Sequence, residues 1–172
     1  MARLRPARTC RNPNSQAWAR YSKKKPKKNY VRALPHTSLL VFNMGNKKGE
    51  YDMELTLRPT HNVQLRSNAL EAARLTANKY LEREIPMQYY FNVVVYPHNV
   101  IREHKMASGA GADRISRGMS QAFGRPISIA ARVRENQPIM KVMVKKEHRS
   151  MATEALRRAT SKLSGNYKIK AV

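Results

Sequence analysis

Residues 89–96 read YYFNVVVY, and the chain continues shortly afterwards with residues 101–124, IREHKMASGAGADRISRGMSQAFG. Aromatic and β-branched residues dominate the first stretch, which predicts a central β-strand that ends at Pro97. The second stretch joins this strand to another strand-like run and is far longer than the usual connection inside a compact domain. A connection of this length is either functional or without fixed structure until a partner holds it.

The long connection carries cations on both sides of a run of small residues. Arg102, His104 and Lys105 precede the run, and Arg114 and Arg117 follow it. Small residues let a backbone approach a partner closely, and the flanking cations indicate that the partner is anionic. The run, at the expected tip of the loop, consists of Ser108, Gly109, Ala110, Gly111 and Ala112.

Strand and helix patterns precede this loop. Residues 38–44 form an apolar run and residues 51–58 alternate in polarity, which predicts two strands in a hairpin-like pair. Residues 64–84 then show apolar side chains at helical spacing, and Asn68 with Glu71 resembles a capping box. We therefore expect a helix over residues 64–84.

Similar patterns follow the loop. Residues 127–134 and 139–145 alternate in polarity and predict an antiparallel pair, and residues 147–163 predict a second helix that Gly165 ends. The expected fold class is α+β, with two helices packed against a mixed or antiparallel sheet. We expect three parts: a basic arm over residues 1–37, one α+β domain over residues 38–164 containing the loop 102–118, and a short basic tail over residues 165–172.

The charge of the chain indicates a polyanionic partner. The formal net charge is +23, from 34 Lys and Arg against 11 Asp and Glu, and a compact chain with this charge repels itself. Nucleic acid is the leading partner, since binding to phosphates releases counterions. Alternatives for the arm are a nuclear-localisation run or a solubilising tail, but its aromatic residues favour an arm that becomes ordered on RNA. The candidate stacking residues are Trp18, Tyr21 and Tyr30, and the candidate RNA-binding cations of the arm are Arg3, Arg5, Arg8, Arg11, Arg20, Lys23, Lys24, Lys25, Lys27 and Lys28.

The sequence lacks the residue spacing that a catalytic or metal site needs. The five histidines are scattered, and Cys10, the single thiol, lies in the arm without a fixed base. The Gly-Ala-Gly run at 109–111 lacks the third glycine of a dinucleotide fingerprint and the Gly-Lys-Ser/Thr of a P-loop. We expect no enzyme activity, cofactor, metal or small-molecule substrate. A basic regulator or chaperone that binds DNA or RNA transiently remains an alternative, and a small nucleotide-using enzyme is disfavoured.

The sequence also gives no sign of a membrane partner. No apolar run approaches the length that spans a bilayer. The N-terminus lacks a myristoylation glycine and an apolar signal core. A single cysteine fits a reducing cytosol.

Short motifs spread through most of the chain carry a resemblance to a known family. They are 6–8 (PAR), 68–74 (NALEAAR), 77–80 (ANKY), 96–98 (YPH), 105–106 (KM), 109–114 (GAGADR), 118–119 (GM), 122–124 (AFG), 131–133 (ARV) and 154–159 (EALRRA). In this order they resemble the L-ten-e family of archaeal and eukaryotic large-subunit ribosomal proteins, the counterpart of bacterial large-subunit protein sixteen. The chain lacks the C-terminal extension of eukaryotic members, which favours an archaeal source.

The resemblance implies a fold, a location and a set of partners. The implied fold is an α/β sandwich with a hammerhead-like strand motif, and the implied role is a structural one on the cytoplasmic ribosome. The expected partners are large-subunit ribosomal RNA, tRNA and neighbouring ribosomal proteins. Carried onto this sequence, residues 102–118 form a loop that reaches towards the peptidyl transferase centre and the tRNA acceptor arms. The loop cations expected first at phosphates are Arg102, Lys105, Arg114 and Arg117.

Overall fold

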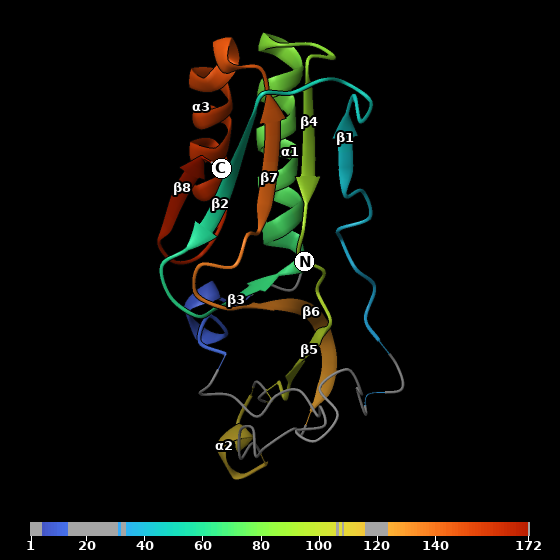
Figure 1. The fold of residues 1–172 in the computed structure, drawn as a ribbon. Helices are drawn as coiled ribbons and strands as arrows, with labels where there is room; N and C mark the ends of the chain where they lie inside the picture. Colours follow the sequence, from blue (N-terminus) through green and yellow to red (C-terminus); the bar gives the residue numbers. More distant parts are fainter. Residues whose placement is uncertain are drawn as a thin grey trace.

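The structure, a computed structural model, describes residues 5–13, 31, 34–105, 107, 109–115 and 124–171. Its strands form two antiparallel sheets (Figure 1). The elements in chain order are β1 Asn43–Gly45, β2 Met53–Pro59, β3 Val63–Arg66, α1 Ser67–Glu84, β4 Tyr89–Val93, β5 Asn99–Glu103, α2 Ala112–Ile115, β6 Arg125–Val133, β7 Met140–Val144, α3 Arg149–Thr160 and β8 Tyr167–Ala171, with 3-10 turns at Ala7–Thr9 and Lys146–His148.

The large sheet has five strands in the order β1-β4-β7-β2-β8, and both long helices cover one of its faces (Figure 1). Alternation along the strands places Leu57, Phe91 and Val142 in the core beneath α1 and α3. Alanines such as Ala77 on α1 and Ala155 on α3 are fully buried, and their small size lets the helices pack closely. The predicted α+β class, with two helices on an antiparallel sheet, is confirmed.

The predicted strand pairings are wrong. The expected hairpin of residues 38–44 with residues 51–58 does not form, because β1 pairs with β4 while β2 pairs with β7 and β8. The expected pair of residues 127–134 with residues 139–145 is also absent, because β6 belongs to the second sheet and β7 lies between β4 and β2. Alternating polarity identifies the buried face of each strand, but it does not identify its neighbour.

The start of the first helix is also corrected. Residues 63–66 form β3, which pairs with β6, and α1 begins only at Ser67. The capping box is not observed, since Arg66 occupies the N-cap and Glu71 accepts hydrogen bonds from the Arg74 guanidinium at 2.9 and 2.5 Å. The expected C-terminal tail contains the edge strand β8, which pairs with β2.

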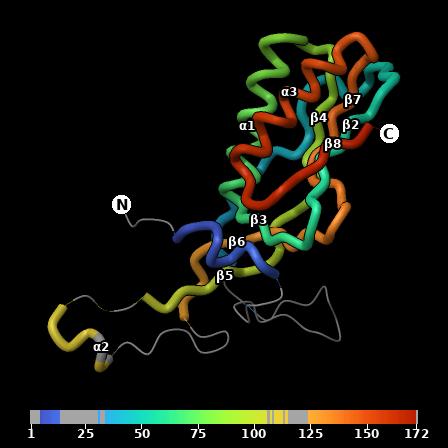
Figure 2. Tube along the Cα trace, turned by 90° about the vertical axis from the view of Figure 1, so that its left-hand side faces the viewer, coloured from blue at the N-terminus to red at the C-terminus, as the bar shows by residue number. Residues whose placement is uncertain are grey.

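A small sheet, in the order β3-β6-β5, lies beyond one end of the large sheet (Figure 1). Its strand β5 occupies the first residues of the stretch that the sequence predicts as loop. The connection from β5 to β6 therefore leaves from the far end of this sheet, and α2 lies well away from the helices (Figure 2). Among the described residues, no helix combines the length and apolarity that crossing a membrane requires.

Candidate nucleic-acid interface

The N-terminal segment packs on both faces of the small sheet. Cys10 lies in a buried cluster with Ile101 and Ala130. Val31 lies in a separate buried cluster with Val100 and Ile129, which point to the opposite face because neighbouring residues of a strand alternate. The chain therefore contacts one face of this sheet at residue 10 and the other face at residue 31.

Hydrogen bonds fix residues 5–13 against β3 and β6. The buried Gln64 side chain donates to the Cys10 carbonyl at 2.9 Å, and the Gln64 backbone N–H donates to the Arg11 carbonyl at 2.7 Å. Arg66 donates through Nη1 to the Arg5 carbonyl at 2.8 Å, and Arg132 donates to the Pro13 carbonyl. These hydrogen bonds could not be predicted from the sequence, because they depend on the pairing of β3 with β6.

The single thiol belongs to this packing. Burial raises the pKa of the Cys10 thiol, and its Sγ donates to the Ala7 carbonyl at 3.5 Å. Because the thiolate is the reactive form, we expect Cys10 of the folded chain to react with a thiol reagent much more slowly than in urea. Equal labelling rates in buffer and in urea would show that residues 5–13 do not pack on the small sheet in solution.

The base of the long loop is closed by contacts between its two ends. Arg102 on β5 donates through Nη1 to the Gly124 carbonyl at 2.9 Å, and a register shift in the β5–β6 pair falls at Ile101 and Arg102. Gly124 has φ +97°, and a Cβ there would lie 2.7 Å from the carbonyl carbon of Glu103. Only glycine fits this position without strain. Glu103 also forms an ion pair with Arg5 at 3.4 Å, so the arm and the loop base meet.

The loop tip is open. Gly109 has φ +130° and Gly111 has φ +76°, and a Cβ at either position would contact no described residue within 4 Å. The Gly109 carbonyl accepts a hydrogen bond from Ala112 N–H at 3.2 Å, which starts the single turn α2. Lys105 precedes the tip, Arg114 lies within α2, and both are exposed. The tip therefore combines small residues with cations whose side chains face solvent.

Comparison with known proteins supplies the family. The model of the family described as ribosomal protein L16p/L10e matches residues 19–170. The chain belongs to this family. It is 46% identical over 156 residues to large ribosomal subunit protein uL16 of Archaeoglobus fulgidus, covering 90% of each chain. It is 50% identical over 138 residues to the uL16 of Hyperthermus butylicus (80% of this chain, 77% of the relative), and 47% identical over 161 residues to that of Staphylothermus marinus (93% and 88%).

Membership in the L16p/L10e family confirms the resemblance that the motifs carry. The similar proteins are archaeal, in agreement with the expected archaeal source. A protein of this family is a structural part of the ribosome and not an enzyme. Among the described residues, no group of three His, Cys, Asp or Glu side chains is placed to hold a metal ion.

The candidate residues of this L16p/L10e chain fall into three groups. Arg8, Arg11, Lys105 and Arg114 are exposed. Arg102 and His104 are partly buried, and Arg5 is paired with Glu103. The candidates outside the described residues are Arg3, Trp18, Arg20, Tyr21, Lys23, Lys24, Lys25, Lys27, Lys28, Tyr30, Ser108 and Arg117.

Proposed function

We propose that this chain is a component of the large ribosomal subunit that binds large-subunit ribosomal RNA through its basic arm and its long loop. One observation carries the proposal: the arm packs on the small sheet at Cys10 and Val31 and the loop leaves from its strand β5, at the end of the molecule away from the helices (Figure 2). Relatives named as large-subunit proteins support the location, and the net charge of +23 supports RNA as the partner.

The exposed cations at this end of the molecule position the protein on RNA. Arg8 and Arg11 lie in the anchored part of the arm, and Lys105 and Arg114 flank the loop tip. They bind phosphates, which fixes the position and orientation of the protein without reading a base sequence. Arg102 acts from the loop base, because one of its donors already holds the Gly124 carbonyl.

The loop itself extends towards the peptidyl transferase centre and the tRNA acceptor arms. Its tip has no bulky side chain at Gly109, Ala110 or Gly111, so its backbone fits a narrow space between RNA elements. Neighbouring ribosomal proteins complete the contacts of the chain in the subunit.

The salt dependence of RNA binding tests the phosphate contacts. For the full chain and a large-subunit ribosomal RNA transcript, we expect the logarithm of the binding constant to fall linearly with the logarithm of salt concentration. Replacing Lys105 and Arg114 by Gln should reduce the slope by roughly 0.7–0.9 per lost phosphate contact. Lys79→Gln is the control, since Lys79 is exposed on α1 about 18 Å along the helix from Ser67. An unchanged slope in the double variant would contradict the role of the loop cations.

Sedimentation distinguishes a resident ribosomal protein from a transient basic regulator. In cell extract at moderate salt, the chain should sediment with large subunits. A chain that stays outside the subunits under these conditions would refute the proposed function.

A further inference from the structure

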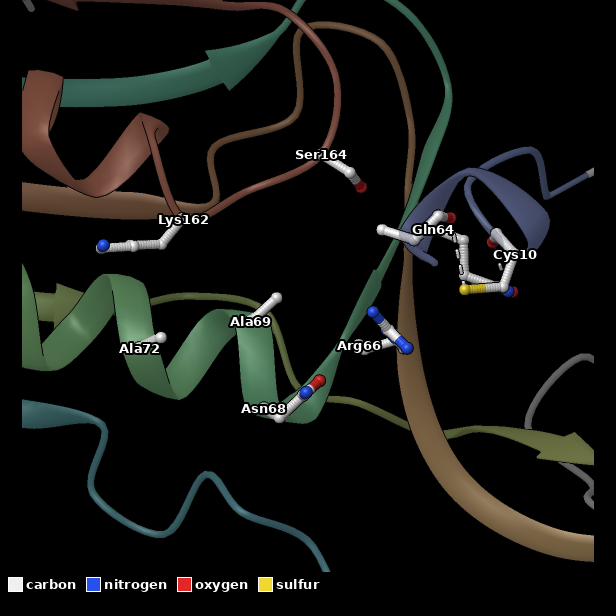
Figure 3. Close-up of a pocket in the computed structure, with 9 residues that line it drawn as sticks. Cys10, Gln64, Arg66, Asn68, Ala69, Ala72, Lys162 and Ser164 are labelled. Atoms are coloured by element: carbon white, nitrogen blue, oxygen red, sulfur yellow. Dashed lines mark hydrogen bonds between the residues drawn. The ribbon is translucent and has the colours of Figure 1, made fainter. Parts of the chain in front are cut away.

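A cavity of about 230 Å³ lies between the N-terminal 3-10 turn, the β3–α1 junction and the chain that follows α3 (Figure 3). In Figure 3, Lys162 lies at one end of it and Cys10 at the other, with Arg66 and Asn68 between them. The methyl groups of Ala69 and Ala72 line the side formed by α1 (Figure 3). None of the residues that line the cavity is acidic.

The electrostatics of this cavity favour an anion. Arg66 and Lys162 contribute two formal positive charges. The helix α1 begins at its edge, and the side chain of its N-cap residue, Arg66, makes no capping hydrogen bond. Uncapped N–H groups at a helix N-terminus carry partial positive charge and bind phosphate oxygens well. Ser164, whose hydroxyl points into the space in Figure 3, adds a neutral donor.

Two polar atoms of residues that line the cavity are left without partners. Among the described residues, Arg66 Nε and Asn68 Oδ1 are both buried and make no hydrogen bond. Arg66 is already held in place through Nη1, which donates to the Arg5 carbonyl at 2.8 Å. Arg66 Nε is a donor and Asn68 Oδ1 is an acceptor. A ligand that satisfies both atoms therefore supplies one acceptor and one donor.

The backbone of RNA carries this combination. A phosphate oxygen accepts from a guanidinium, and the ribose 2′-hydroxyl donates to an amide oxygen. The backbone of DNA supplies the phosphate but lacks the hydroxyl. A carboxylate from a protein would satisfy Arg66 and leave Asn68 unpaired.

We propose that this cavity binds one ribonucleotide unit of an RNA backbone, with one phosphate at Arg66 and the start of α1, the 2′-hydroxyl at Asn68, and the adjacent phosphate of the same backbone at Lys162. The proposal rests on the proposed function, because it names one site through which the chain holds ribosomal RNA. The site lies beside the docked residues 5–13, so RNA bound there also holds the arm against the small sheet.

The sugar preference of the site tests Asn68. The full chain, labelled with ¹⁵N, is titrated with tetrauridylate and with its 2′-deoxy counterpart. The backbone N–H signals of Asn68 and Ala69 should shift with the ribo probe, and Asn68→Ala should reduce the ribo-over-deoxy preference about tenfold. Asn166→Ala, which removes the same group from an exposed position, is the control and should keep the preference. An unchanged preference in Asn68→Ala would overturn the proposal.

Lys162→Gln gives an independent measurement if Asn68→Ala folds poorly, since Lys162 is exposed. With a large-subunit ribosomal RNA transcript, Lys162→Gln should lower the salt slope by roughly 0.7–0.9, the loss of one phosphate contact. If the wild-type chain binds this transcript and Lys162→Gln keeps the full slope, the cavity proposal fails and the proposed function stands. If the wild-type chain does not bind the transcript, both fail.

Discussion

Deletion of residues 108–112 is expected to leave the chain folded while translation by ribosomes that carry it falls several-fold. Gly109, Ala110 and Gly111 are exposed, and no position of the described core lies in this stretch. The loop base stays closed through Arg102 and Gly124, and shortening a long loop changes its closure entropy little. The melting temperature of the isolated chain should therefore stay within about 2 °C of the wild type.

The loss of translation should depend on what the tip presents to RNA. Ala110→Glu places a negative charge at the exposed tip and should impair translation or late subunit maturation, because phosphates repel it. Ala110→Ser, which stays small and neutral, should behave as the wild type. Normal translation by ribosomes carrying the deletion, or unfolding of the isolated deletion protein, would contradict the proposed role of the loop.

Much of the secondary structure could be predicted because it follows from local patterns. The alternation of residues 139–145 gives β7, and the helical spacing of residues 147–163 gives α3 within a few residues at each end. The pairing of the strands could not be predicted in this way. The strands β4 and β7 separate β1 from β2 in the sheet, and no local pattern encodes this order. The strand β3 could not be distinguished from α1 in the sequence for a related reason. Its alternating Val63 and Leu65 directly precede the apolar stripe of α1, so one periodic run covers two elements.

The candidate interface could be predicted only in part. Composition identifies the basic arm and the loop, since cations and small residues are visible in the sequence. The contacts that hold them are not visible, because Gln64 and Arg66 meet the arm only through tertiary packing. The same holds for the cavity, where Asn68 on α1 and Lys162 in the chain after α3 lie far apart in sequence. Asn68 also shows how a local motif misleads, since its expected capping box gives way to an ion pair between Glu71 and Arg74.

Phe91→Ala is expected to cause the largest loss of stability. Phe91 is fully buried on β4, between Met44 on β1 and Val142 on β7, in the core that α1 and α3 cover. Truncation leaves a cavity that a packed core cannot fill, which costs about 3–5 kcal/mol. Small domains are stable by only about 5–15 kcal/mol, so the midpoint of equilibrium unfolding in urea should fall markedly.

Val94→Ala provides the matched control. Val94 follows directly after β4 but is 43% exposed, so its truncation should cost less than about 1 kcal/mol. The two variants differ in function as well, because β4 leads through Pro97 into β5 and so carries the loop base. Phe91→Ala should therefore weaken binding to ribosomal RNA at temperatures where Val94→Ala still binds fully. Equal unfolding midpoints for the two variants would show that the packing of β4 against the helices does not dominate the stability of this fold.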